Sequence, residues 1–357
     1  MGKQKREAEK IVRVRRRLLE WYERSRRDLP WRRNRDPYAI WVSEIMLQQT
    51  RVAVVVERYQ AFMARFPTLM TLARAPEQEV LAAWSGLGYY RRARMLHKAA
   101  QHVADHGQGK LPQMAAELRL LPGIGAYTAA AVASIAHGER VAVVDGNVER
   151  VLCRLEGWKA GSGSQLRRKI DALATDLVDP DRPGDSNQAL MELGATLCSP
   201  RNPRCEECPV ADDCKTQGEH PTAPRPKMLR RDVAYALTMR NGRKAGQTHR
   251  EVLLEQRPAA QTVMPGLWEL PSLIDVKVPE KELRLTVRHA IMQVNYSVRI
   301  RTILKDDVDA LTVAGGVRRW VPLKNAPGMA LTGLTRKVLT RLNLITDIAP
   351  QTGDDVL

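Results

Sequence analysis

The chain has 357 residues, of which 44% are hydrophobic and 27% are charged. This length predicts about two domains, and the composition excludes a disordered or collagen-like chain. Lys and Arg outnumber Asp and Glu by 57 to 40, which gives a net charge of +17. Such a charge favours a polyanionic partner such as nucleic acid, with a generally cationic surface as the alternative. No apolar run of about 18 residues occurs, so no membrane span is expected, and the first residues lack the apolar core of a secretory signal.

Residues 1–225 are predicted to be mostly helical. Apolar residues recur at three- and four-residue spacing in the segments 8–23, 39–66, 76–84, 91–106, 125–137 and 147–156. A proline-rich stretch then predicts a linker at 218–231. Beyond it, strands are expected at 232–239, 250–255 and 294–304, and a helix at 332–344. We therefore expect a multidomain chain, with an all-α domain over residues 1–217 and a smaller α+β domain over residues 232–357.

The basic excess is strongest at the N-terminus. Residues 1–33 hold 13 Lys and Arg against five Asp and Glu. Such a run is usually a solvated helix face. Trp21, Tyr22 and Trp31 lie among the arginines, which raises the expectation of a ligand-facing surface.

Four of the five cysteines lie close together in sequence, at Cys198, Cys205, Cys208 and Cys214. This clustering indicates a metal site in an intracellular protein, because a secreted disulfide scaffold spreads its cysteines along the chain. Four thiolates suit either zinc or a [4Fe–4S] cluster. Three cysteines follow a lone first one instead of forming two short pairs, and this spacing favours the cluster, with zinc left open. Cys153 stands alone and is expected to be a buried apolar residue.

The segment Leu121-Pro122-Gly123-Ile124-Gly125 precedes a helical run. Two glycines around one apolar residue let backbone N–H groups approach an anion, and the helix N-terminus behind them adds positive charge. The pattern therefore predicts a helix–hairpin–helix phosphate clamp, with an ordinary interhelical turn as the alternative.

Two carboxylates have the surroundings expected of an acid–base pair. Glu44 shares a helical stripe with Ile40, Trp41 and Ile45, where loss of water would raise its pKa toward that of a general acid. The alternative is a buried structural Glu paired with an Arg. Asp145 ends an apolar run and precedes a helix, so it is either a simple helix cap or an ionised partner to Glu44, as in the cleavage of glycosidic bonds.

Five motifs occur in the order found in one known family. Together with Cys198, Cys205, Cys208 and Cys214, the segments 41–50, 86–90, 121–132 and 144–148 resemble the adenine DNA glycosylases of the MutY family, within the helix–hairpin–helix superfamily that includes endonuclease III. The resemblance covers most of residues 13–214. Residues 265–271 resemble part of the MutT-like, Nudix-fold domain of that family, which is a weaker match.

The resemblance implies base excision repair, in which adenine mispaired with 8-oxoguanine or guanine is flipped out of duplex DNA and hydrolysed from it. Glu44 would protonate adenine N7, Asp145 would stabilise the sugar cation, and Tyr127 and Asn147 would position these groups. The adenine pocket would include Arg27, Trp31 and Leu47. DNA would be contacted by Gln49, Tyr89, Gly123 and Gly125. A structural [4Fe–4S] cluster would occupy the 198–214 loop, and a monovalent cation would lie at the helix–hairpin–helix.

Three details refine this expectation. Tyr127 replaces the lysine nucleophile of bifunctional relatives, so a monofunctional enzyme is expected. The C-terminal domain lacks the long acidic helix of nucleotide pyrophosphohydrolases, so it should bind and not hydrolyse. Ile291-Met292-Gln293 replaces the family's Phe-Ser-His loop, which weakens the expected preference for 8-oxoguanine.

Two other functions are weighed against this one. An endonuclease III-like glycosylase on oxidised pyrimidines would need a lysine where Tyr127 stands, and would lack the extra C-terminal domain. A non-catalytic iron–sulfur DNA-binding or redox-sensing protein would have no need of both Glu44 and Asp145. For the adenine glycosylase we expect a cytoplasmic monomer, associated with the nucleoid through DNA and not with a membrane.

Overall fold

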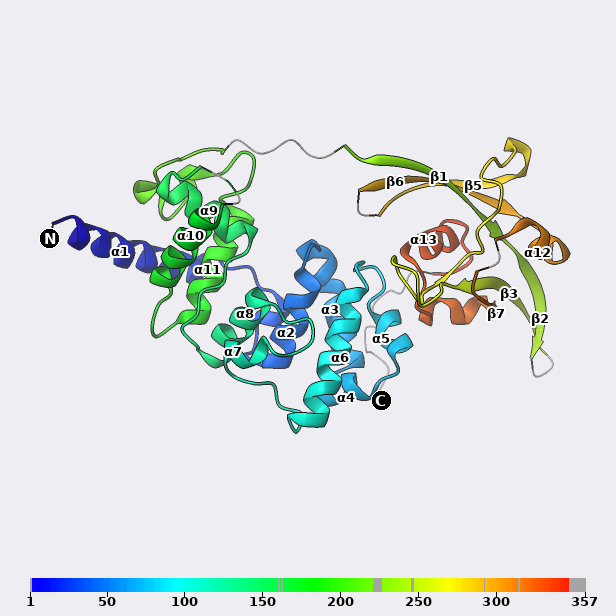
Figure 1. Cartoon of the computed structure of the whole chain (residues 1–357), viewed down its shortest axis with the longest axis horizontal. Helices are drawn as coiled ribbons and strands as arrows, with labels where there is room; N and C mark the ends of the chain where they lie inside the picture. The colour runs from blue at the N-terminus through cyan, green and yellow to red at the C-terminus, as the bar shows by residue number, and fades with distance from the viewer. Residues whose placement is uncertain are drawn as a thin grey trace. The chain divides into compact units, whose positions relative to one another are not determined.

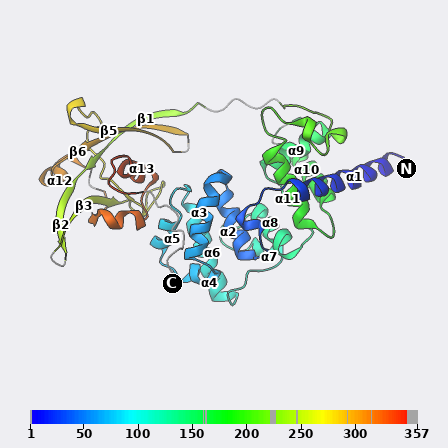
Figure 2. The ribbon, with the colours of Figure 1, turned by 180° about the vertical axis from the view of Figure 1, so that it is seen from behind.

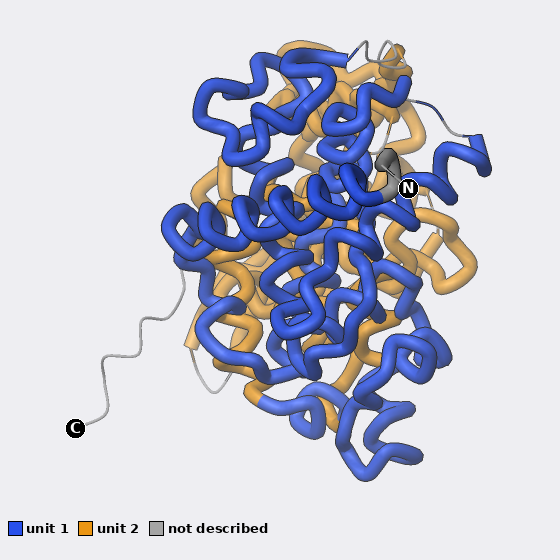
Figure 3. The backbone as a smooth tube through the Cα atoms, turned by 90° about the vertical axis from the view of Figure 1, so that its left-hand side faces the viewer, with its two compact units in different colours: residues 1–49, 68–73, 98–224 blue, residues 50–67, 74–97, 225–357 orange. Residues whose placement is uncertain are grey.

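The computed structural model describes residues 2–159, 161, 163–220, 227–244, 247–291, 293–313 and 315–346. Two compact units make up the chain (Figure 3). The first contains Met1–Gln49, Thr68–Ala73 and Lys98–Pro224, and the second contains Thr50–Pro67, Arg74–His97 and Arg225–Leu357. The second unit thus joins N-terminal helical segments to the C-terminal region. Each compact unit therefore combines segments that are separated in the sequence. The domain boundaries expected at 217 and 232 stay a prediction.

Helices build the first unit. They are α1 (Gly2–Ser25), η1 (Pro30–Arg32), α2 (Pro37–Leu47), α7 (Ala115–Leu118), α8 (Ala126–His137), α9 (Gly146–Glu156), α10 (Ser164–Leu177), α11 (Pro183–Thr196), η2 (Cys205–Glu207) and η3 (Ala211–Asp213). In both ribbon views the C-terminal part of α1 lies beside α10 and α11 (Figures 1 and 2). Two further helices, α4 (Leu69–Arg74) and α6 (Arg91–His106), contain residues of both units.

The expectation of one helical segment over 39–66 is wrong. Helix α2 ends at Leu47, and α3 (Val52–Arg65) begins after a break. Within the break Gln49 has a φ of 57°, in the left-handed region where a helix cannot continue. The aromatic residues Trp21, Tyr22 and Trp31 of the basic N-terminal run are all buried, so they do not form an exposed surface among the arginines.

Several basic residues of α1 pair with acids inside the first unit. Lys10 pairs with Glu156, Arg13 Nη2 lies 2.5 Å from Asp213 Oδ1, and Arg17 Nη1 lies 2.9 Å from Asp212 Oδ2. Both aspartates precede Cys214 directly. Part of the N-terminal charge excess therefore holds α1 against the cysteine-containing loop.

The second unit combines helices with two small sheets. Its helices are α3, α5 (Glu77–Ala83), α12 (Val308–Leu311) and α13 (Gly333–Arg341), with 3-10 turns η4 (Glu280–Glu282), η5 (Lys305–Asp307) and η6 (Leu323–Gly328). Its strands are β1 (Leu229–Leu237), β2 (Met239–Lys244), β3 (Gln247–Gln256), β4 (Trp268–Glu269), β5 (Leu283–Ile291), β6 (Val294–Thr302) and β7 (Val317–Pro322). Strand β1 therefore begins inside the predicted linker, whose residues 221–226 lie outside the described part of the chain.

Strand order explains how the C-terminal core forms. β6 pairs in parallel with β1 and antiparallel with β5, while β3 pairs antiparallel with β2, β4 and β7. Alternate residues of both sheets point into one core, which also receives α13. Buried members include Val252, Leu254, Val287, Val298, Ile300, Val321, Val338 and Leu339. The predicted α+β character of this region is confirmed.

Two expectations about the C-terminal region can be placed on these strands. Between Pro271 and β5 the described chain contains the 3-10 turn η4 and no α-helix. Ile291 ends β5 opposite Val294 of β6, so Ile291 lies at the end of the hairpin that β5 and β6 form. Met292 lies outside the described residues. In the described part of the chain no helix is both long and apolar enough to cross a membrane.

Candidate active site and cysteine loop

Glu44 is a buried carboxyl on α2. Asp36 caps this helix by accepting a hydrogen bond from Tyr38 N at 3.0 Å. Every residue of α2 from Tyr38 to Met46 is buried, and Glu44 is only 6% exposed. Its Oε2 atom is buried without a hydrogen-bond partner among the described residues. A buried acceptor left in this state costs free energy unless a ligand satisfies it, so Glu44 has the character of a functional group.

The surroundings of Glu44 hold its proton near neutral pH. Burial raises the pKa of Glu44 from 4.5 to about 7; the neighbouring Tyr127 hydroxyl opposes this rise and the negative charge of Asp145 adds to it. Arg32 has the smallest effect on this pKa, and it pairs directly with Glu192 instead, at 2.9 Å. The alternative of a structural Glu–Arg pair at Glu44 therefore does not describe this site. A carboxyl with such a pKa can act as a general acid.

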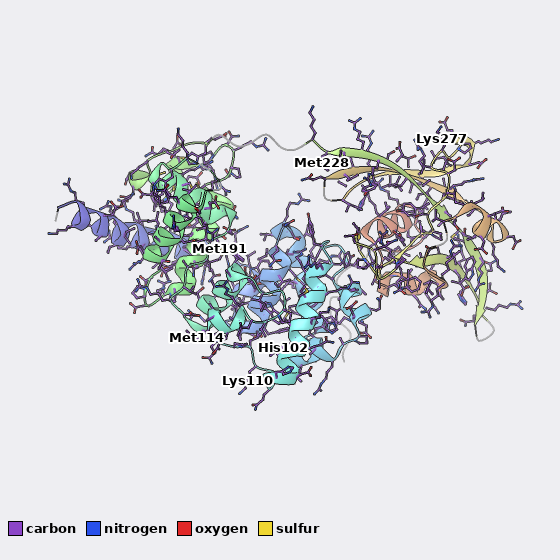
Figure 4. All side chains as sticks on the ribbon, viewed as in Figure 1. His102, Lys110, Met114, Met191, Met228 and Lys277 are labelled. Carbon is purple, nitrogen blue, oxygen red and sulfur yellow. The ribbon has the colours of Figure 1, made fainter. Side chains whose placement is uncertain are left out.

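Tyr127 stands in the first turn of α8, beside both carboxylates. Its hydroxyl donates to Met191 Sδ at 3.3 Å, and Met191, labelled in Figure 4, belongs to α11. Burial and the charges of Glu44 and Asp145 raise the pKa of Tyr127 well above its usual value. The phenol therefore stays protonated and serves as a hydrogen-bond donor.

Asp145 is held in place by backbone and amide donors. Its Oδ1 accepts from Val148 N at 2.7 Å, which makes it the N-cap of α9. Its Oδ2 accepts from Asn147 Nδ2 at 3.0 Å. Both of these donors are satisfied best by an ionised carboxylate, and the N-terminus of α9 favours negative charge. Asp145 is therefore a helix cap and also a charge next to Glu44.

Arg150 connects Asn147 to the cysteine loop, a role that sequence reasoning missed. Its Nη2 donates to Asn147 Oδ1 and to Gly194 O, both at 2.8 Å. Its Nε donates to Cys198 O at 2.9 Å. One guanidinium thus orients the amide that binds Asp145 and the backbone of the first cysteine. Only the i, i+3 spacing of Asn147 and Arg150 along α9 could have suggested this contact.

The predicted base pocket contains a carboxylate that the sequence analysis did not identify. Arg27 Nε lies 2.7 Å from Glu192 Oε1, and Arg32 pairs with the same carboxyl. Burial tends to raise the pKa of Glu192, but hydrogen bonds from Arg27 and Arg32 lower it to about 2. Trp31 is buried in η1 and Leu47 is half-buried at the end of α2. The available signal was the same as for Glu44, a glutamate on the buried face of a helix.

The predicted DNA-contacting residues are exposed. In the first unit, Gln49 is exposed with a φ of 57°. The hairpin between α7 and α8 exposes Gly123, whose φ is 75°, and Gly125, which caps α8, while Ile124 between them is buried. In the second unit, Tyr89 is 48% exposed with a φ of 45°. The structure thus leaves the hairpin backbone accessible to an anion.

The cysteine loop packs on the core of the first unit. Cys198, Cys208 and Cys214 contact the same apolar cluster in which Cys153 is buried, as expected for that residue. All five cysteines are free thiols. Arg154, which is 2% exposed, donates to Cys198 Sγ at 3.4 Å and to Ser199 O at 2.7 Å. Among the described residues no three His, Cys, Asp or Glu side chains are grouped closely enough for a single metal ion.

Residues 198–214 match the iron-sulfur binding domain of endonuclease III. The residues present fit such a group: four thiols supply the full ligand set of a [4Fe–4S] cluster, and Arg154 places a positive charge against a ligand sulfur. Burial raises the pKa of the Cys208 thiol to about 11, so bound iron would be needed to hold it as a thiolate. The loop is therefore a [4Fe–4S] site, with Cys198, Cys205, Cys208 and Cys214 as the ligands expected from the sequence.

The protein is expected to be brown when purified anaerobically, with broad absorption near ~400 nm and about four iron atoms per chain, as a cluster held by four cysteine thiolates requires. Cys208→Ser should lose this absorption, whereas Cys153→Ala should keep it, because Cys153 only packs against apolar neighbours. Iron analysis and absorption spectra check the expectation. Stoichiometric zinc without iron would contradict it.

The helical part of the chain is similar to known DNA repair proteins. Residues 42–175 match the HhH-GPD superfamily of base excision DNA repair proteins. Among curated proteins, adenine DNA glycosylase of Homo sapiens is 50% identical over 210 residues, which is 56% of this chain and 38% of that protein. Adenine DNA glycosylase of Mycolicibacterium smegmatis is 46% identical over 196 residues, 54% of this chain and 66% of that protein. The chain spans about two fifths of the length of the mammalian relatives that it matches.

Solved structures give the same assignment. A thermostable thymine-DNA glycosylase superposes with a TM-score of 0.54 and 30% identity, over 58% of this chain and 97% of that one. A trapped endonuclease III–DNA covalent intermediate has a TM-score of 0.51 at 23% identity, over 59% of this chain and 96% of that one, and supports the fold alone. The predicted helix–hairpin–helix fold is thus confirmed, and the chain belongs to the HhH-GPD superfamily of base excision DNA repair proteins.

Proposed function

We propose that this protein is a monofunctional adenine DNA glycosylase, which hydrolyses the N-glycosidic bond of mispaired adenine in duplex DNA. One observation carries the proposal: Glu44 is a buried carboxyl whose pKa is raised to about 7 by burial, beside the capped carboxylate Asp145. Curated adenine DNA glycosylases at 40–50% identity support adenine as the base.

The two carboxyl groups supply complementary steps. Glu44 gives its proton to adenine N7. The C1′–N9 bond then breaks, and the electron pair of that bond leaves with adenine, which departs as a neutral base. Asp145 stabilises the positive charge that develops on the sugar. Water then adds at C1′, and its proton returns to a carboxylate, which leaves an abasic site. Tyr127 donates a hydrogen bond beside this pair, and Asn147 holds Asp145 at 3.0 Å.

The remaining predicted residues fit the handling of a flipped base. In this proposal Arg27, Trp31 and Leu47 line the adenine side, with the charge of Arg27 balanced by Glu192. Gln49 and Tyr89 fill the stack around the vacated position. Gly123 and Gly125 bind a phosphate, and a monovalent cation at this hairpin stays a prediction. DNA with mispaired adenine is the proposed partner, bound by a monomer in the cytoplasm, in association with the nucleoid.

A glycosylase acting on oxidised pyrimidines is the second function considered, because residues 198–214 match the iron-sulfur binding domain of endonuclease III. Tyr127 argues against the lysine-dependent lyase chemistry of such enzymes, because a phenol cannot form a Schiff base with the sugar. A non-catalytic DNA-binding protein is disfavoured by the buried, unpartnered Oε2 of Glu44. The decisive experiment offers duplexes with adenine, thymine glycol or thymine opposite G, and reads base release with and without hot alkali. Release of adenine alone supports the proposal, and release of either pyrimidine contradicts it.

Excision is expected to slow as the pH rises through about 7, because only protonated Glu44 can donate and its pKa is raised to about 7. Above that value the single-turnover rate should fall about tenfold per pH unit. Since the pKa of folded Glu44 lies above the unfolded value near 4.5, the free energy of unfolding should also fall with rising pH between these two values. Rates measured with DNA saturation checked at each pH test this, and a flat profile would overturn it.

We also propose that the C-terminal α+β region is a MutT-like domain that binds DNA and does not hydrolyse nucleotides.

The preference for adenine opposite 8-oxoguanine over adenine opposite G should be weaker than is usual for the MutY family, by roughly ten- to a hundredfold. The reason is that Ile291, at the hairpin tip, offers no hydrogen bond to the lesion. Restoring Phe-Ser-His at 291–293 should increase the ratio of the two single-turnover rates. A full preference without any gain on restoration would contradict this.

A further inference from the structure

The loop that presents Tyr89, residues 84–90 between α5 and α6, has an unusual backbone. Gly86, Gly88 and Tyr89 have φ values of 92°, 68° and 45°. Tyr89 is the residue among them with a side chain, and an L residue adopts this region only when its surroundings enforce it. Tyr89 nevertheless leaves 48% of its surface exposed. The backbone at Tyr89 is therefore strained, while the aromatic ring that it carries is exposed to solvent.

Contacts within the loop, and with Arg92 in the first turn of α6, hold this backbone in its conformation. Trp84 Nε1 donates to Gly88 O at 3.1 Å. Arg92 Nη2 donates to Leu87 O at 2.9 Å and to Gly88 O at 3.2 Å. The Arg92 guanidinium carbon lies 5.5 Å from the Trp84 ring centre and 5.6 Å from that of Tyr89. One arginine therefore binds the glycine turn and covers a face of the exposed ring.

The residues on both sides of this turn are anchored to the C-terminal region. Tyr90, 4% exposed, donates its hydroxyl to Leu331 O at 3.2 Å. Ser85, 1% exposed, accepts from Arg336 Nε at 2.7 Å. Arg336 lies on α13, is 6% exposed, and also donates to Met329 O and to Pro327 O. These bonds are buried, where competing water is excluded and each one positions its partner strongly.

Two more contacts extend the same attachment. Arg94, in the first turn of α6, donates to Pro265 O at 2.5 Å. Gln78, on α5, donates to Gly266 O at 3.3 Å. Both acceptors lie just before β4, so the helices on either side of the Tyr89 loop are tied to the C-terminal region, and all of these residues belong to the second compact unit (Figure 3).

We propose that the C-terminal domain positions Tyr89 for insertion into the DNA base stack, with Arg336 and the Leu331 carbonyl as the positioning groups that act through Ser85 and Tyr90. The proposal rests on the proposed function, since it assigns Tyr89 to the duplex around the flipped base. It gives the C-terminal domain a second task besides any contact of its own with DNA. An aromatic ring held out on a fixed backbone can insert beside an estranged base without first being ordered.

The test uses the full-length protein carrying Glu44→Gln, so that no base is released during the measurement. Binding is read from the fluorescence of 2-aminopurine placed beside the mismatch, which reports stacking directly, and from Kd for mismatched and fully paired duplexes. The variants are Tyr89→Ala, which removes the ring, and the double variant Ser85→Ala with Tyr90→Phe, which removes two hydroxyls. Thr340→Val is the matched control, because Thr340 is on α13 but its buried hydroxyl has no partner among the described residues.

Tyr89→Ala should lose most of the fluorescence change. The double variant should lose at least about half of it and bind the mismatched duplex about tenfold more weakly, with affinity for paired DNA within about twofold of the parent. Thr340→Val should match the parent. Melting temperatures identify variants that fail to fold, and if the double variant does so, each single hydroxyl deletion and Arg336→Lys replace it.

Two outcomes overturn the proposal. One is a double variant with parental fluorescence while Tyr89→Ala loses the signal, which would mean that the loop keeps its shape without the C-terminal anchors. The other is Tyr89→Ala with parental fluorescence, which would mean that the ring does not enter the stack. Failure of the proposed function is seen separately, as an absence of adenine release by the protein with Glu44 intact, and the fluorescence test then uses the duplex bound most tightly.

Discussion

Glu44→Gln is expected to abolish adenine excision and to leave duplex affinity nearly unchanged. The amide occupies almost the same volume in the buried α2 environment but has no acidic proton to give to N7. Loss of general-acid catalysis typically costs about two to four orders of magnitude in rate, and the variant should reach at least that loss. Its free energy of unfolding above pH 7 should exceed that of the unmodified protein, because no buried charge forms at this position.

Single-turnover excision and equilibrium DNA binding separate these effects. Glu20→Gln is the control, since Glu20 lies exposed on α1 and its loss changes the net charge by the same amount. The control should excise adenine at the parental rate. If Glu44→Gln retained about a tenth or more of the parental rate, the loss would be smaller than the loss expected when a general acid is removed. Glu44 would then not be the general acid.

Asp145→Asn is expected to slow excision by at least about a hundredfold, or ~3 kcal/mol of transition-state stabilisation. Asparagine is as good an N-cap as aspartate, so Val148 N at 2.7 Å keeps an acceptor and α9 should stay intact. What the variant lacks is the negative charge that faces the developing sugar cation. The substitution therefore distinguishes the two roles that the structure gives Asp145.

Melting temperature and excision rate should accordingly respond very differently to Asp145→Asn. Stability should fall by no more than about 1 kcal/mol, for the weakened contact with Asn147 Nδ2. Asp145→Ala should lose the cap as well and be less stable than Asp145→Asn. If Asp145→Asn kept full activity, Asp145 would be a helix cap and nothing more.

Sequence patterns predicted the features of the site that depend on one element. Burial of Glu44 follows from its place on the apolar stripe of α2, and capping by Asp145 follows from its place before α9. The cysteine spacing likewise predicted the iron–sulfur loop. Each of these signals is local, because helix periodicity and cap chemistry act over a few residues.

Features that depend on long-range packing could not be predicted in the same way. Glu192 lies 165 positions from Arg27 along the chain, and no local pattern links them. Arg150 looks like any polar residue of an amphipathic helix until Cys198 O is seen to accept from it. The second compact unit also joins Thr50–Pro67 and Arg74–His97 to the C-terminal region, although the sequence analysis assigned these two helical segments to the first domain. Charged and polar contacts of this kind are set by the tertiary structure alone.

The basic N-terminal run illustrates the same limit. Charge counting along residues 1–33 suggested a surface for a polyanion, but Arg13 and Arg17 are already paired with acids beside Cys214. The net charge of +17 still favours DNA binding. Because Arg13 and Arg17 pair with acids, less of the positive charge of α1 is available to DNA than a count along the sequence implies.

The most direct test of the central claim is to incubate the purified, iron-loaded protein with a duplex holding one adenine opposite G, and to quantify free base and DNA strand by mass spectrometry before any alkali treatment. The proposed chemistry predicts one free adenine for each abasic site, an intact strand until hot alkali is added, and neither product with Glu44→Gln. A strand already cleaved before alkali, or adenine release by Glu44→Gln at the parental rate, would contradict it.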